Sequence, residues 1–335
     1  MLFNPFNIKN LTAKNRIVMP PMCMYKAADG IVNDWHAVHY GARAIGQVGT
    51  IIVEATAIEP RGRITMNDLG LWNNKHIDPF KKIVDFCKEQ GAIVGVQLAH
   101  AGRKSQVKNE PIVAPSPLAF SDKFPIPHEL KTSELTETIR RFTEAAYRAR
   151  KAGFDFIEIH SAHGYLINQF LSRLTNLRGD IYGQERHLFL KEILSSIKQV
   201  LSHDMPVFLR VSGEEYHPNG NHPEDLAIML NQVKDSFDIL HVSSGGVFEK
   251  ESYDFFPGYQ LEFAAKLKEL VGKPVISVGR FENPKIAEQA LFEGKADMIA
   301  IGKGLLTDPY WPLHAAKALN FDLEWPVSYQ RAKIL

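Results

Sequence analysis

Residues 154–166, with the sequence FDFIEIHSAHGYL, place two imidazoles and a phenol close together along the chain. An apolar run that alternates with a period of two ends at His160, and His163 and Tyr165 follow it. Such a trio could ligate a metal ion, hold an oxygen atom of a ligand, or fill space in a core. A metal is the least favoured of the three, because no acidic or thiolate residues stand at suitable spacing to complete a zinc shell.

The run that ends at His160 is one of eight short β-branched runs, at residues 16–21, 50–56, 92–100, 155–161, 206–212, 238–244, 273–279 and 296–302. Stretches with apolar residues at helical spacing lie between most of them. Strands that alternate with helices predict a parallel sheet, and eight of them favour an α/β fold closed into a (β/α)8 TIM barrel. The irregular segment 101–132 is interpreted as a loop insertion after the third strand.

The C-terminal ends of the strands build the active site in barrels of this kind. Side-chain alternation places Glu158 and His160 on one face of the fourth strand, and this face is the barrel interior if the isoleucines between them face the helices. The same argument directs Glu54 and Arg210 inward, where charges must pair. We therefore interpret Glu54 and Glu158 as parts of a structural Glu–Arg network, with Arg210 nearer the rim.

The last two predicted strands both end in a glycine followed by a basic residue, Gly279 with Arg280 and Gly302 with Lys303. Phosphate sites in these barrels are frequently built by the loops after the seventh and eighth strands. Glycine lets backbone N–H groups approach phosphate oxygens, and the basic side chain adds charge. The pattern predicts a phosphorylated ligand whose flat, heteroatom-rich part is held by other strand ends.

The composition is that of an ordinary globular protein of 335 residues, 45% hydrophobic and 23% charged, with a formal net charge of +1. Without a basic block, neither nucleic acid nor an anionic membrane is an expected partner. Cys23 and Cys87 give neither a disulfide framework nor metal-ligand spacing. No signal peptide or membrane-spanning run is evident, so we expect a cytoplasmic protein.

Several motifs occur in the order RIVMPPMCMY, QVGTIIVEATAI, GRIT, VQLAHAGRK, EIHSAHGYL and IGKGLLTDP. Together they resemble the old yellow enzyme family, and the cysteine in PMCMY resembles its bacterial, thermophilic-like subclass of NADPH dehydrogenases. The resemblance implies one FMN-binding (β/α)8 domain over residues 1–335. Its expected activity is hydride transfer from NADPH or NADH to the activated C=C bonds of enones, enals and maleimides, to quinones, and to nitro compounds.

The resemblance also assigns roles to single residues. His160 and His163 correspond to the two donors that hold the acceptor's carbonyl oxygen, Tyr165 to the proton donor, and Tyr25 to a tyrosine on the substrate side. The residues it implies for FMN binding are Pro20, Pro21, Met22, Cys23, Ala55, Gln97, Arg210, Gly302 and Lys303.

The phosphate argument adds Gly279 and Arg280 to the FMN-binding residues. The family usually has arginine where this chain has Lys303, and a lysine offers a point charge rather than a planar fork. Arg280 is therefore expected to share the phosphate contact.

The tail at about residues 320–335 carries an apolar cluster, formed by Trp325, Pro326, Val327 and Tyr329, with Arg331 just beyond. In the thermophilic-like subclass a C-terminal arginine reaches the neighbouring subunit's active site, and Arg331 corresponds to it. We therefore expect a homodimer or a dimer-based homotetramer in which Arg331 approaches the partner's substrate pocket.

The sequence leaves two other functions as alternatives. A metal-dependent hydrolase on the same barrel would be expected to carry an early His-x-His pair, where this chain has VMPPMC. A barrel that binds FMN without useful turnover would be expected to lack the set of His160, His163 and Tyr165, which is intact here.

Overall fold

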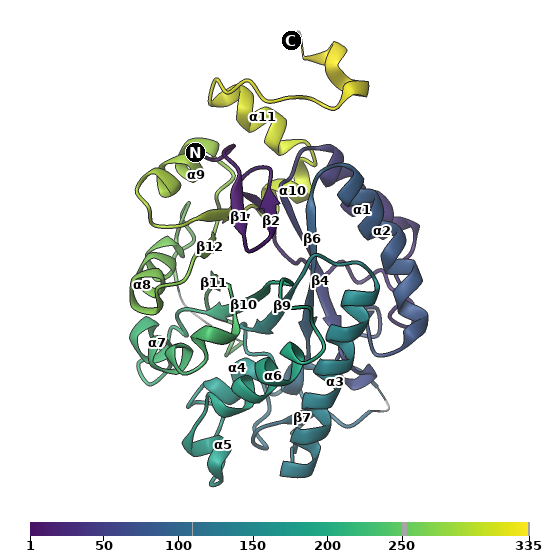
Figure 1. Cartoon of the computed structure of the whole chain (residues 1–335). Helices are drawn as coiled ribbons and strands as arrows, with labels where there is room; N and C mark the ends of the chain where they lie inside the picture. Colours follow the sequence, from purple (N-terminus) through teal and green to yellow (C-terminus); the bar gives the residue numbers. More distant parts are fainter. Residues whose placement is uncertain (109, 250–252, 334–335) are drawn as a thin grey trace.

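Eight parallel strands close into a barrel in the computed structural model, which describes residues 1–108, 110–249 and 253–333 (Figure 1). The predicted (β/α)8 fold is thereby confirmed. The barrel closes because the first strand pairs with both the second and the last. In chain order the barrel strands are β3 (Ile17–Met19), β4 (Thr50–Ala57), β6 (Ile93–Ala99), β9 (Phe156–Ser161), β10 (Val207–Ser212), β11 (Ile239–Ser243), β12 (Val275–Val278) and β13 (Met298–Ala300).

The helices surround this barrel (Figure 1). Local sequence sets their ends: Asn283 caps α9 by accepting a hydrogen bond from the N–H of Lys285 (3.0 Å), and α8 stops at Gly272, whose φ of 70° suits glycine. The helices are α1 (Asp34–Ile45), α2 (Ile77–Glu89), α3 (Thr132–Lys151), α4 (Leu166–Leu171), α5 (Ile181–Gln184), α6 (Leu188–Lys198), α7 (Pro223–Asn231), α8 (Leu261–Val271), α9 (Pro284–Phe292), α10 (Lys303–Thr307) and α11 (Trp311–Ala318).

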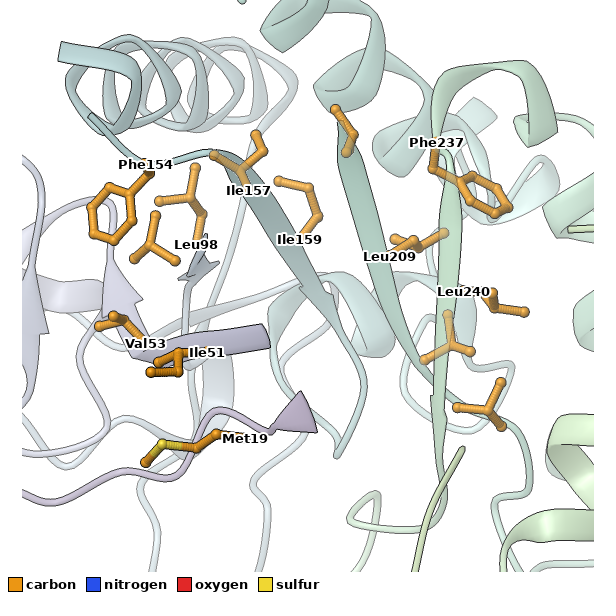
Figure 2. Close-up of a cluster of buried hydrophobic side chains, with 14 of the residues drawn as sticks. Met19, Ile51, Val53, Leu98, Phe154, Ile157, Ile159, Leu209, Phe237 and Leu240 are labelled. Atoms are coloured by element: carbon orange, nitrogen blue, oxygen red, sulfur yellow. The ribbon is translucent and has the colours of Figure 1, made fainter. Parts of the chain in front are cut away.

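The main hydrophobic core lies between the barrel and the helices. Figure 2 shows Ile157 and Ile159 of β9 in this cluster, together with Leu98 of β6 and Leu209 of β10. Full burial of each such side chain stabilises the fold by roughly 1.5–3 kcal/mol. Because strand residues alternate in direction, the residues between these isoleucines face the barrel interior, as the sequence predicted.

A second, smaller cluster fills the interior of the barrel. Phe156 and Phe208 stack there with ring centroids 4.0 Å apart. Gly95 makes room for them, since a Cβ atom at this position would lie 2.2 Å from the Phe156 ring. Ile8 and Ala13 join the same cluster. These two residues come from an N-terminal hairpin that the sequence analysis did not predict, β1 (Phe6–Ile8) paired with β2 (Leu11–Ala13).

The segment after β6 is an excursion with little regular structure, as expected for an insertion. Its elements are the 3-10 turn η3 (Gly102–Lys104) and two short paired strands, β7 (Val113–Ala114) and β8 (His128–Glu129). The short strand β5 (Leu69–Gly70) adds to the edge of β4. Further 3-10 turns lie between the larger elements: η1 (Pro60–Gly62), η2 (Asn74–His76) and η4 (Lys234–Ser236).

The tail leaves the barrel beyond α11, and its 3-10 helix η5 (Val327–Ala332) stands apart from the strands (Figure 1). Residues 334 and 335 of the predicted tail lie outside the described residues. In the described part of the chain, none of the helices combines the length and the apolar character needed to cross a membrane.

Candidate active site

The two histidines of the opening motif are fixed by the backbone and by serines on neighbouring strands. His160, on β9, accepts a hydrogen bond at Nδ1 from the N–H of Ala162 (3.3 Å), so its neutral ring carries the proton on Nε2. His163 has a left-handed backbone, with φ of 58°. Its N–H donates to Ser212 Oγ (2.8 Å), and its ring Nε2 lies 2.8 Å from Ser243 Oγ. These anchors hold a backbone conformation that is uncommon for residues other than glycine, although histidine tolerates it better than most.

Tyr165 joins these histidines at the start of α4. Its ring centroid lies 4.9 Å from that of His160, and the two imidazole centroids are 5.3 Å apart at right angles. A small cavity touches both His160 and Tyr165, and its other walls include Ala55, Asp68 and several small residues. The trio that the sequence singled out is therefore brought together at the C-terminal end of β9, beside a small cavity.

The protonation of the trio follows from its burial. Desolvation, followed by the nearby charge of Arg210, holds the pKa values of His160 and His163 well below the usual range. Both rings are therefore neutral at physiological pH and can donate through one N–H each. Burial also raises the pKa of Tyr165, so its phenol keeps its proton. The site offers three neutral hydrogen-bond donors.

A group of polar side chains lies next to the trio inside the barrel. Glu158 is fully buried and accepts hydrogen bonds from Gln97 Nε2 (2.8 Å) and from the His241 ring (2.7 Å). Arg210 lies within the field of this carboxylate, while burial lowers its pKa. Its Nη1 donates to the carbonyl of Pro21 at 3.4 Å, and its buried Nε has no partner among the described residues. An unmatched buried donor costs about 1–3 kcal/mol, so this guanidinium is suited to a ligand that brings acceptor atoms.

Glu54 does not join this layer, contrary to the expectation from strand alternation. It accepts hydrogen bonds from the Tyr40 hydroxyl on α1 (3.0 Å) and from the N–H of Met24 (2.8 Å). The reason is a break in the strand, since the register of β4 against β6 shifts between Val53 and Thr56. Burial raises the pKa of Glu54 to about 7.

The chain after β3 forms one wall of the site. There the Cys23 thiol is hydrogen-bonded to the Tyr25 side chain and to the backbone of Ala55. Burial raises the pKa of the Cys23 thiol, and the charges of Asp68 and Glu54 raise it further. The thiol is therefore protonated at neutral pH and is no activated nucleophile. Tyr25 has a left-handed backbone, with φ of 54°, and remains 43% exposed.

The two glycine–basic turns of the sequence line one pocket. Gly302 caps α10, and a Cβ atom at this glycine would stand 3.7 Å from Met22 Sδ and Pro20 Cγ, so the end of β3 adjoins the turn. Arg280 has a φ of 58° and donates from Nη1 to the carbonyl of Phe255 (3.1 Å). Among the residues that line the pocket are Ser243, Tyr259, Gly279, Arg280, Gly302 and Lys303.

Arg331, a predicted site residue, does not lie at the pocket of its own chain, since it is exposed in η5 on the tail. Conversely, no role had been predicted from the sequence for Ser212, His241 or Lys104. Side-chain alternation along the strands could have predicted the direction of Ser212 and His241. Ser212, for example, follows Arg210 by two positions and therefore lies on the same face of β10. Within the described ranges, no group of three or more His, Cys, Asp or Glu side chains is arranged to hold a metal ion.

Comparisons with known proteins agree with this geometry. The chain matches the model of the NADH:flavin oxidoreductase / NADH oxidase family over residues 1–322. It is 47% identical to an NADPH dehydrogenase of Geobacillus thermodenitrificans (strain NG80-2) over 337 aligned residues, which cover 99% of this chain and 98% of the relative.

Solved structures show the same architecture. Morphinone reductase superposes with a TM-score of 0.81 at 26% identity, over 98% of this chain and 92% of its own. A 2-naphthoyl-CoA reductase in complex with 2-naphthoyl-CoA gives a TM-score of 0.89 at 24% identity. That likeness concerns the fold alone, and this chain spans about half, 52%, of that longer chain.

Proposed function

This chain belongs to the NADH:flavin oxidoreductase / NADH oxidase family, an oxidoreductase family, as its resemblance to the old yellow enzymes predicted; on that premise we propose that it is an FMN-dependent NAD(P)H:acceptor oxidoreductase. Its acceptors are the activated C=C bonds of enones, enals and maleimides, together with quinones and nitro compounds. The observation that carries the proposal is the convergence of His160, His163 and Tyr165 as neutral donors beside a buried, incompletely bonded Arg210.

The residues around the pocket fit FMN. The unpartnered Nε of Arg210 is suited to an acceptor atom of the flavin's pyrimidine edge, and Gln97 beside it offers an amide. Arg280 and Lys303 supply charge for the phosphate. FMN bound there would supply the hydride transfer from NADPH or NADH to the acceptor. The remaining residues proposed to contact it are Pro20, Pro21, Met22, Cys23, Ala55, Gly279 and Gly302.

The two histidines bind the acceptor's carbonyl oxygen. Negative charge develops on this oxygen when the neighbouring C=C bond gains hydride, and two N–H donors aimed at it lower the barrier. For His160 the donor is Nε2–H, since Nδ1 accepts from the backbone. For His163 we assign Nδ1–H, with the hydroxyl of Ser243 donating to Nε2. Tyr25 stands at the exposed side of the site, where it contacts the substrate.

Tyr165 supplies the proton that completes reduction of the C=C bond. Its phenol is neutral and lies beside His160, so a substrate held by the histidines is within its reach. All the proposed acceptors share an electron-poor bond next to an oxygen atom. This shared chemistry accounts for one site serving several acceptor classes.

A spectrum of the purified protein tests the proposal. We expect absorption bands of oxidised flavin that bleach on anaerobic addition of NADPH and return when an enone or a quinone is added. A colourless protein, or a coloured one that NADPH leaves unbleached, would refute the assignment.

We further propose that the chain is one FMN-binding barrel domain, residues 1–335, whose tail from about residue 320 reaches a second copy in a homodimer or a dimer-based homotetramer. Two exposed apolar features support this. Val327 on the tail is 82% exposed, and Val38 on α1 is 72% exposed beside a surface groove that Ile83 and Phe86 also line. Arg331 on the tail then approaches the partner's substrate pocket.

Arg331→Ala is therefore expected to raise the KM for the acceptor by about tenfold or more, since a charge-assisted hydrogen bond contributes about 1.5–3 kcal/mol. The bound FMN should stay in place. Lys333→Ala is the matched control, because Lys333 pairs with Asp322 of its own tail (2.6 Å) and should leave KM unchanged. Steady-state kinetics with sedimentation measurements check this. A fully active monomer would contradict the proposed assembly.

A further inference from the structure

Lys104, at the end of η3, touches the candidate proton donor from outside the trio. Its ammonium nitrogen lies 4.9 Å from the centroid of the Tyr165 ring and 4.5 Å from that of Phe120. It also donates to two backbone carbonyls, those of His163 (2.9 Å) and Gly246 (3.0 Å). The half-buried ammonium is held in place, because its contacts come from three different segments, residues 163–165, Phe120 and Gly246.

The two carbonyls come from loops that are in direct backbone contact. A Cβ atom at Gly164 would lie 2.1 Å from the Gly246 carbonyl oxygen, and one at Gly246 would lie 2.5 Å from the Cα of His163. Only glycines allow the loops after β9 and β11 to meet so closely. Lys104 binds a carbonyl from each loop at this junction, so the position of its charge relative to Tyr165 is set by the barrel and not by a flexible side chain alone.

We infer that Lys104 is a positioning residue for proton donation, with its ammonium stabilising the tyrosinate that forms as Tyr165 gives up its proton. In this step the O–H bond of Tyr165 breaks, a C–H bond forms at the acceptor carbon, and one negative charge remains on the phenolate. Water then returns the proton to the oxygen. The inference rests on the proposed function, in which Tyr165 protonates the reduced C=C bond.

Lys104 would favour proton donation because a cation is attracted more strongly to a phenolate than to a phenol. A cation over an aromatic ring is attracted by its π electrons, and the attraction grows when the ring carries negative charge. An interaction that is stronger in the transition state than in the ground state accelerates the reaction. Burial works in the opposite direction, since it raises the pKa of Tyr165. The fixed ammonium offsets part of this cost.

The test compares two acceptors. Lys104→Met keeps a long side chain without charge, and we expect kcat for an enone to fall by roughly tenfold. Reduction of a quinone should change less than about twofold, because its product takes protons from water. Lys104→Arg, which keeps the charge, should recover most of the enone rate. Lys123→Met is the matched control, since Lys123 lies in the same insertion but is exposed and pairs with Glu249.

A double-mutant cycle with Tyr165→Phe separates the outcomes. If Lys104 acts through the phenol, Lys104→Met adds no further loss to Tyr165→Phe. Multiplying losses, or equal losses with enone and quinone, would overturn the inference and leave the role of Tyr165 standing. A Tyr165→Phe enzyme with the wild-type enone rate would instead refute the proposed proton donor, and the inference with it. Lys104→Gln serves the same comparison if Lys104→Met does not fold.

Discussion

Replacement of either His160 or His163 by alanine is expected to slow acceptor reduction on the order of a hundredfold or more, which corresponds to about 2.7–4 kcal/mol of transition-state stabilisation. In the proposed mechanism each imidazole donates one N–H to the oxygen on which negative charge develops. Both rings are neutral, and His160 is buried, so competing water weakens its hydrogen bond little. Stopped-flow mixing of the NADPH-reduced enzyme with an enone measures this step directly.

The histidine variants should keep their FMN and lose affinity for phenolic ligands, which present an oxygen to the same donors. His203→Ala is the control, because the His203 side chain is fully exposed and far along the chain from the trio. Because the pKa values of His160 and His163 lie well below the usual range, neither ring gains charge as the pH falls from 8 to 6.5. Wild-type acceptor reduction by both alanine variants would refute the assignment.

Tyr165→Phe is expected to slow enone reduction by roughly a hundredfold or more, the usual size of a general-acid contribution. The variant removes one hydroxyl and keeps the ring that packs 4.9 Å from His160, so binding should survive. Quinone reduction should be spared, since a quinone product is protonated on oxygen by water. Turnover rates of the Tyr165→Phe variant measured with an enone and with a quinone give a ratio, and a low enone-to-quinone ratio supports Tyr165 as the proton donor.

Equal loss with both acceptor classes would show that Tyr165 supports the site in another way. Tyr25→Phe is the matched comparison, because this phenol also lies in the site but is 43% exposed and bonded to Cys23. We expect it to alter substrate affinity and not the preference for quinones over enones.

The fold and the trio were predictable because both depend on periodicity along the chain. Side-chain alternation along β9 predicted that Ile157 and Ile159 point outward and that His160 points inward. The structure shows the isoleucines in the core between barrel and helices. Glycine–basic turns after the last two strands were likewise local patterns, and closure of the barrel brings Arg280 and Lys303 to one pocket. In each case the sequence needed only the direction of a side chain and the order of the strands.

Glu54 shows where this reasoning fails. Alternation predicted an inward carboxylate paired with Arg210, yet the shifted register of β4 against β6 turns Glu54 toward Tyr40 on α1. A bulge is a property of two paired strands, so one strand's sequence does not reveal it. The N-terminal hairpin (β1 and β2) was not predicted for a similar reason. Its residues Ile8 and Ala13 pack against strands that come much later in the chain.

By itself, then, the sequence determined a parallel eight-stranded barrel, the gathering of His160, His163 and Tyr165 at one strand end, and the neighbouring turns that suit a phosphate, because short-range spacing fixes all of these. Only the tertiary structure decided how the trio is held and charged. The serines that anchor His163, the unpartnered Nε of Arg210 and the ammonium of Lys104 beside Tyr165 all arise from contacts between segments distant in sequence. Such contacts depend on strand register and on close loop packing, which no local pattern encodes.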